Sequence, residues 1–116
     1  MEYTFTAEAV IRLEQIVNLW PIGNRAESVV IDKLAQELAI KESEFETVHW
    51  QPTPDGMAIT YQPDTPLIRN IDAADLDILK HMAEHPPEKL AWSRRERQLQ
   101  SAIFEPLGLE PWFTSN

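Results

Sequence analysis

The stretch that decides the fold class is FETVHWQPTPDGMAITYQ, residues 45–62, which has the pattern of two strands joined by a turn. Phe45–Gln51 and Met57–Gln62 contain the β-branched and aromatic residues that suit a pleated surface. Asp55-Gly56 lies in the connection between them, and Asp-Gly is a strong signal for a hairpin turn. Alternate residues of the second run are apolar, so we expect the hairpin to pack one face on helices.

Upstream of the hairpin, apolar residues recur every three or four positions, which predicts helices over about residues 7–20 and 25–40. Thr6 is the expected N-cap of the first helix and Asn24 that of the second. Pro21 ends the first helix because it has no N–H to continue it. With so short a connection, the two helices should pack as an antiparallel or crossed pair.

The N-terminal segment Glu2–Thr6 alternates polar and aromatic residues, with Tyr3 and Phe5 on one side. It forms either a short strand or an extended lead-in to the first helix. Because two strands alone are marginally stable in water, the hairpin should either recruit this segment or depend on packing against helices.

Two further helices follow the hairpin. Asp72 is the expected N-cap of the third helix, which ends at the two prolines after His85. Ser93 and Glu96 form the capping box of the fourth helix, and Pro106 stops it. The apolar stripes of the four helices are Val10, Leu13, Val17 and Trp20; Val30, Ile31, Leu34, Ala35 and Leu38; Leu76, Leu79, Met82 and Ala83; and Leu99, Ala102 and Ile103.

The sequence therefore predicts one α+β domain over residues 1–116, with about four helices packed with a β-hairpin. The expected order is (β)-α-α-β-β-α-α, where the first strand is the N-terminal option. A length of 116 residues is close to the usual size of a single domain, and 43% apolar residues are enough for one hydrophobic core.

Composition excludes several classes of function. The chain has no cysteine, which rules out disulfides, a cysteine-ligated zinc site and a cysteine nucleophile. Its formal net charge of −9 disfavours binding to nucleic acids and anionic membranes. No signal peptide and no membrane-spanning stretch is evident, so we expect a cytoplasmic protein that requires no cofactor.

His81-Met82-Ala83-Glu84-His85 reads H-x-x-E-H and resembles the inverted zinc-peptidase motif over these five residues only. Histidines four apart on a helix can share a metal ion, and Asp77 lies one turn earlier. His81, His85 and Asp77 are therefore weak candidate metal ligands. The preferred interpretation is an exposed polar edge of the helix, in which His85 is a cation near the negative helix end.

A basic cluster, formed by Lys89, Arg94, Arg95 and Arg97, stands beside Trp92 in this acidic chain. Arginine and tryptophan are typical of interface hot spots, and they also suit contact with nucleic acid. Three interpretations remain open, namely salt bridges within the chain, an acidic partner or second copy, and nucleic acid. The apolar tail of residues 107–113 either closes the domain's own core or packs on a neighbour.

These observations predict a non-enzymatic interaction module (an adaptor, inhibitor or assembly factor) that binds another protein or a second copy of itself as a homodimer. The candidate partner-binding residues are Trp92, Arg94, Arg95, Arg97, Trp112 and Phe113. One alternative is a small metal-dependent hydrolase that uses His81, Glu84 and His85. Another is a nucleic-acid-associated regulator that binds through the edge from Arg94 to Arg97.

Overall fold

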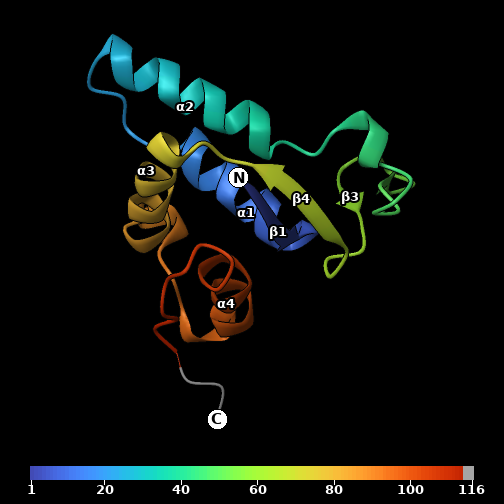
Figure 1. Cartoon of the computed structure of the whole chain (residues 1–116). Coiled ribbons are helices and arrows are strands. Elements are labelled where there is room, and N and C mark those ends of the chain that lie inside the picture. Colours follow the sequence, from blue (N-terminus) through green and yellow to red (C-terminus); the bar gives the residue numbers. More distant parts are fainter. Residues whose placement is uncertain (114–116) are drawn as a thin grey trace.

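The order of elements confirms the predicted α+β class in the computed structural model, which describes residues 1–113 (Figure 1). The helices are α1 (Ala7–Asn18), α2 (Arg25–Leu38), α3 (Ala73–Glu84) and α4 (Arg97–Phe104). The strands are β1 (Glu2–Thr6), β2 (Gln51–Pro52), β3 (Ile59–Thr60) and β4 (Pro66–Asn70). Three short 3-10 turns are η1 (Glu42–Glu44), η2 (Glu88–Leu90) and η3 (Arg94–Glu96).

The core is built around α1, which contacts α2, α3, α4, β1 and β4. The side chain of Thr6 accepts a hydrogen bond from the backbone N–H of Ala9 at 3.1 Å, which confirms the predicted N-cap. Asn24 caps α2 as predicted, since its side chain accepts from the N–H of Glu27 at 2.9 Å. The buried residues of α1 are Ala7, Ala9, Val10, Leu13, Ile16 and Val17.

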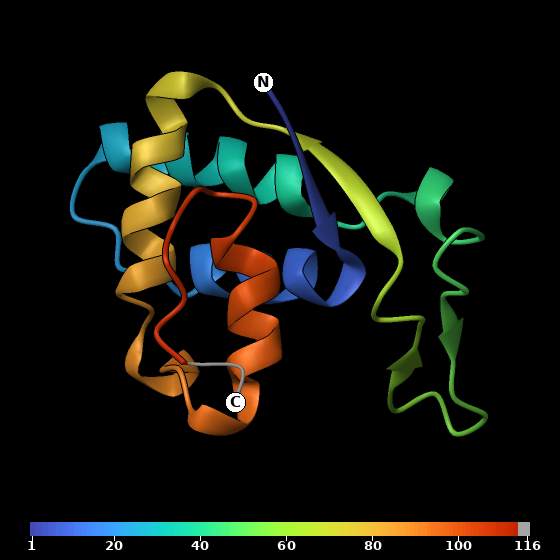
Figure 2. The same ribbon diagram turned by 60° about the horizontal axis from the view of Figure 1, so that its bottom comes forward.

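The N-terminal segment does form a strand, but its partner differs from the one expected. Strand β1 pairs antiparallel with β4 (Figure 2). In this register, Tyr3 lies opposite Arg69 and Phe5 opposite Leu67. Of the two alternatives for the hairpin, recruitment of this segment is therefore ruled out, and the sequence predicts no strand over residues 66–70. Tyr3 and Phe5 do share one face, with ring centroids 6.5 Å apart.

The hairpin is much smaller than predicted. Only Gln51–Pro52 and Ile59–Thr60 pair, and these residues are exposed, so the hairpin does not pack on the helices (Figure 2). Phe45 and the residues up to Trp50 form turns instead of a strand. Prolines in the turn region cannot donate to a ladder, which limits pairing. The aromatic rings stack instead, with centroids of Phe45 and Trp50 5.3 Å apart.

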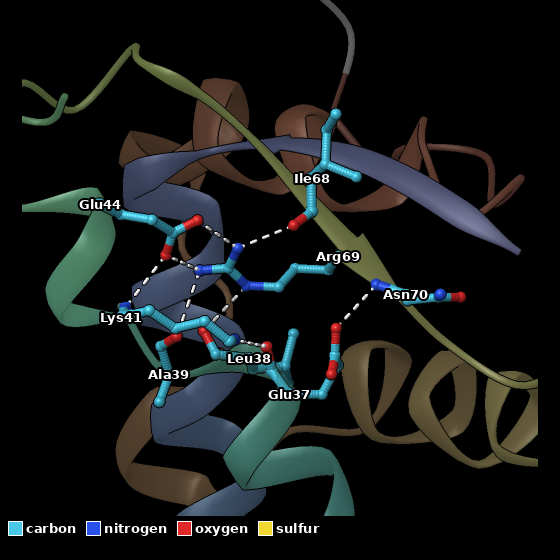
Figure 3. Close-up of polar contacts among 8 residues, drawn as sticks. All are labelled: Glu37, Leu38, Ala39, Lys41, Glu44, Ile68, Arg69 and Asn70. Atoms are coloured by element: carbon cyan, nitrogen blue, oxygen red, sulfur yellow. Dashed lines mark hydrogen bonds and ion pairs between the residues drawn. The ribbon is translucent and has the colours of Figure 1, made fainter.

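A buried arginine joins β4 to the end of α2 (Figure 3). Arg69 is 1% exposed, and its Nη1 and Nη2 atoms donate to the two carboxylate oxygens of Glu44 at 2.8 and 2.7 Å. Its other bonds go to backbone carbonyls, with Nε on Leu38 at 3.4 Å, Nη2 on Ala39 at 3.2 Å and Nη1 on Ile68 at 2.8 Å. A guanidinium has five N–H donors, so these five bonds use its full capacity.

The position of this arginine suits its charge. Leu38 is the last residue of α2 and Ala39 follows it, so Arg69 binds carbonyls that the helix leaves without intrahelical partners. A cation there also complements the negative end of the helix dipole. The hydrogen bonds from Arg69 hold the pKa of Glu44 below its ordinary value of 4.5, and partial burial opposes this effect.

The start of α3 is fixed by an ion-pair cluster with α2. Asp72 is the N-cap residue as predicted, yet its carboxylate binds Lys33 and makes no hydrogen bond to the helix backbone. The Nζ atom of Lys33 also lies 2.9 Å from Oδ2 of Asp75. The hydrogen bond from Lys33 lowers the pKa of Asp72, and the two carboxylates together raise the pKa of Lys33. A tertiary contact has therefore replaced the local capping bond.

Candidate interaction surface

The three arginines of the predicted basic cluster lie on η3 and the first turn of α4, which run directly into each other. The Glu96 carboxylate accepts hydrogen bonds from the backbone N–H and the hydroxyl of Ser93 at 3.3 and 3.2 Å. Glu96 thereby performs its part of the predicted capping box. Because the turn is held in this way, the side chains of Arg94 and Arg95 project from a defined backbone.

Three arginines come together on this turn as predicted. Arg94, Arg95, Arg97 and Gln98 line an open concavity of about 650 Å³. Arg94 and Arg95 are exposed and Arg97 is half-buried. Within residues 1–113, none of these three guanidinium groups forms an ion pair with a carboxylate. We call Arg94, Arg95 and Arg97 the arginine edge. Lys89, the fourth member of the predicted cluster, is exposed on η2 and does not line the concavity.

Trp92, a predicted contact residue, is directed largely into the protein. Its indole N–H donates to the carbonyl of Ala83 at 2.8 Å, and its ring meets Phe104 edge-to-face at 6.0 Å. The guanidinium of Arg12 lies 5.4 Å from the Trp92 ring centroid, within the range of a cation–π contact. Trp92 thus holds the loop that precedes the arginine edge against α3 and α4.

Arg12 has a part in this region that the sequence does not predict. Besides its contact with Trp92, Arg12 forms an ion pair with Glu96. The two residues are 84 positions apart in the chain, so no local spacing could have indicated the pair. Glu96 is therefore engaged by both Ser93 and Arg12, and it is not available to neutralise the arginine edge.

The apolar C-terminal segment packs on its own domain. Leu107 is buried in the core, and the backbone N–H of Trp112 donates to the side-chain oxygen of Gln100 at 2.7 Å. The Trp112 ring meets Phe104 edge-to-face at 5.7 Å and remains 52% exposed. Phe113 is half-buried. Of the two aromatic contact residues predicted in this tail, Trp112 presents the larger exposed fraction.

The histidine motif lies on the C-terminal half of α3. His81 and His85 are exposed, with ring centroids 4.7 Å apart, and His81 meets the Trp20 ring at 5.8 Å. Asp77 is exposed one turn earlier. In the described part of the chain, no three histidine, aspartate or glutamate side chains are grouped so as to hold a metal ion. The structure therefore supplies two neighbouring histidines without a third ligand.

Comparison with known protein families, with curated proteins and with solved structures returned no match for this chain. Among residues 1–113, none of the helices combines the length and the apolar character that crossing a membrane requires. The geometry of the surface is therefore the basis for a functional proposal.

Proposed function

We propose that this chain is a non-enzymatic interaction module that binds an acidic segment of a partner protein through the arginine edge. One observation carries the proposal. Three arginines line one concavity without a described carboxylate partner, although acidic residues outnumber basic residues by 19 to 10 in the chain. Trp112 and Phe113 are proposed as additional contacts, and Trp92 as the residue that positions the edge. The proposal includes a cytoplasmic location for the protein, as expected from the sequence.

Electrostatics supports an acidic ligand at this position. Three guanidinium groups on adjacent turns repel one another, and cations at the first turn of a helix oppose the positive end of its dipole. A carboxylate-rich segment relieves both effects. Arginine suits this role because its planar fork of N–H donors binds a carboxylate through two parallel hydrogen bonds.

The net charge favours a short acidic protein segment over nucleic acid. A nucleic acid extends beyond a small basic patch, and its phosphates would then meet a chain of net charge −9. A second copy of this chain is also acidic, so a homodimer is one form of the proposal. The hydrolase alternative receives less support, because His81 and His85 have no third ligand among the described residues.

The test measures fluorescence anisotropy of a labelled oligoglutamate peptide and of a single-stranded oligonucleotide of equal charge, at low ionic strength. The double variant Arg94→Ala/Arg95→Ala should weaken peptide binding about tenfold or more, a loss expected for removal of two interface arginines. The matched control Arg25→Ala/Lys80→Ala removes the same charge from α2 and α3 and should leave peptide binding unchanged.

The other outcomes are also decisive. Equal weakening by both double variants would show that only net charge matters, and the proposed site would be wrong. Tighter binding of the oligonucleotide than of the peptide would favour the nucleic-acid alternative. If light scattering finds a dimer that the Arg94→Ala/Arg95→Ala variant dissociates, the partner is a second copy of the chain.

A further inference from the structure

A second surface is apolar and lies away from the arginine edge. Between α2 and α3 is a groove of about 360 Å³, lined by Trp20, Ala26, Val30, Ile31, Ile78 and Met82. Helix α3 lies beneath the N-terminal half of α2, so the groove runs between two helices (Figure 1). We call it the α2–α3 groove.

The single ionisable residue that lines this groove is already engaged. Glu27 accepts hydrogen bonds from the backbone N–H of Gly23 at 2.8 Å and from the side-chain amide of Asn24 at 3.2 Å. Its carboxylate therefore stabilises the start of α2. The remaining lining is hydrocarbon and indole, which favours an apolar ligand group.

Exposed apolar side chains occur in the segments that form the groove, and Ile78 lines it. Residues 1–113 contain nine exposed large apolar side chains, and four of these, Leu19, Ile22, Val29 and Ile78, belong to the segments that form the groove. Leu19 and Ile22 lie in the connection that carries Trp20, Val29 precedes Val30 on α2, and Ile78 lines the groove itself. An apolar concavity that includes an exposed large apolar side chain, here Ile78, is typical of a protein–protein contact.

The charge of the bordering helices indicates what kind of protein fits. Helix α2 and residues 72–84 together contain seven carboxylates and three basic side chains. When the mutually paired Lys33, Asp72 and Asp75 are set aside, five carboxylates and two basic side chains remain. A basic partner complements this surplus of negative charge. A second copy of the chain would bring the same surplus to the contact, so charge disfavours self-association through this face.

We propose that the α2–α3 groove binds an amphipathic helix of a partner protein, with apolar anchors in the groove and lysine or arginine along its sides. A helix lying in a groove between helices places anchors at positions i, i+3 or i+4, and i+7. The groove is a separate surface from the arginine edge. It takes a ligand of the opposite charge, so failure of either proposal leaves the other standing.

The test mixes the full chain with a synthetic amphipathic peptide that has leucines at i, i+4 and i+7 and lysines elsewhere. Binding is measured by NMR, from the shifts of the backbone amide signals and of the Trp20 indole signal. The largest shifts should fall on Trp20, Val30, Ile78 and Met82. Ile78→Glu should weaken binding about tenfold or more. Ile59→Glu should not weaken it, although Ile59 is exposed to a similar extent, 42% against 37%.

This pair of variants separates groove binding from attraction to an acidic protein, because each substitution adds one negative charge. Non-specific attraction of a lysine-rich peptide would be equal or stronger in both variants. A peptide with glutamate in place of lysine should bind about tenfold more weakly or worse. If Ile78→Glu fails to fold, Ala26→Glu replaces it, since Ala26 also lines the groove and is exposed.

Three results of the peptide experiments would overturn the proposal. They are shifts that fall mainly outside the groove, equal affinities of the two glutamate variants, and equal binding of the lysine and glutamate peptides. A dimer in light scattering that Ile78→Glu dissociates would assign the groove to a second copy of the chain and would also remove the proposed helix as its occupant.

Discussion

The buried Arg69 and the exposed Arg94 and Arg95 carry the same guanidinium group in opposite surroundings. Arg69 is buried, and its five N–H donors are matched by five hydrogen bonds to Glu44 and to backbone carbonyls. Arg94 and Arg95 are exposed, and neither forms an ion pair with a carboxylate among residues 1–113. The difference teaches that the buried arginine serves the fold, whereas the exposed arginines make no comparable contact among residues 1–113, which is why the interaction surface is proposed there.

The largest expected effect comes from removing the buried guanidinium. Arg69→Met should reduce the free energy of unfolding by about 3–5 kcal/mol, because Glu44 loses its cation and the last carbonyls of α2 lose their donors. Urea denaturation measures the loss. Arg94→Met, the same substitution at the exposed edge, should change it by less than about 0.5 kcal/mol. Similar losses of unfolding free energy in Arg69→Met and Arg94→Met would show that the buried and the exposed arginines do not differ in their contribution to stability.

Glu44→Gln tests the same pair from its acidic side. It should cost about 1.5–3 kcal/mol at neutral pH, the contribution of hydrogen bonds to a charged group. Since Arg69 holds the pKa of Glu44 below 4.5 in the folded state, the pair stabilises the protein above the unfolded pKa. That stabilisation is lost as pH falls through the folded pKa.

The advantage of the wild-type chain over Glu44→Gln should therefore shrink on acidification. Urea unfolding of both proteins, from neutral pH to well below 4.5, measures it. A stability difference that stays constant or grows in acid would contradict the lowered pKa of Glu44.

Gln100 is intermediate between the two cases. Its side chain is buried, but only one of its two polar atoms has a hydrogen-bond partner among the described residues. Its oxygen accepts from the N–H of Trp112, while its Nε2 has no hydrogen-bond partner among the described residues. Gln100→Met should change stability by about 1 kcal/mol or less, because removing an unpaired buried amide offsets the lost bond. Hydrogen exchange at the Trp112 amide should accelerate. Unchanged exchange there would show that Gln100 does not anchor the C-terminal segment.

Helix positions and caps could be predicted from the sequence because their causes are local. Thr6 and Asn24 bond to backbone groups three residues away, and Ser93 meets Glu96 at the same spacing. The arginine edge was found for the same reason, because its members lie within four positions of one another. By contrast, the ion pair of Arg12 with Glu96 joins residues 84 positions apart.

Strand β4 escaped prediction because the usual pattern of burial is reversed at two of its five positions. A half-buried strand normally places apolar residues inward and polar residues outward. Here Ile68 is exposed and Arg69 is buried, so residues 66–70 show no such alternation of side-chain character. Glu44, the last residue of η1, is the partner that makes the burial of Arg69 stable. The α2–α3 groove likewise depends on three segments that meet only in the folded chain.

The smallest expected change in stability belongs to the arginine edge. Arg94→Ala/Arg95→Ala should leave the free energy of unfolding within about 0.5 kcal/mol of wild type. We expect this small change to be an increase in stability. Both arginines lie at the positive end of a helix and near each other, so their removal relieves repulsion, and added salt should diminish the gain. Urea denaturation at two salt concentrations measures this. A loss above about 1 kcal/mol would mean that these side chains support the fold, and the surface proposed for an acidic partner would then have a structural explanation.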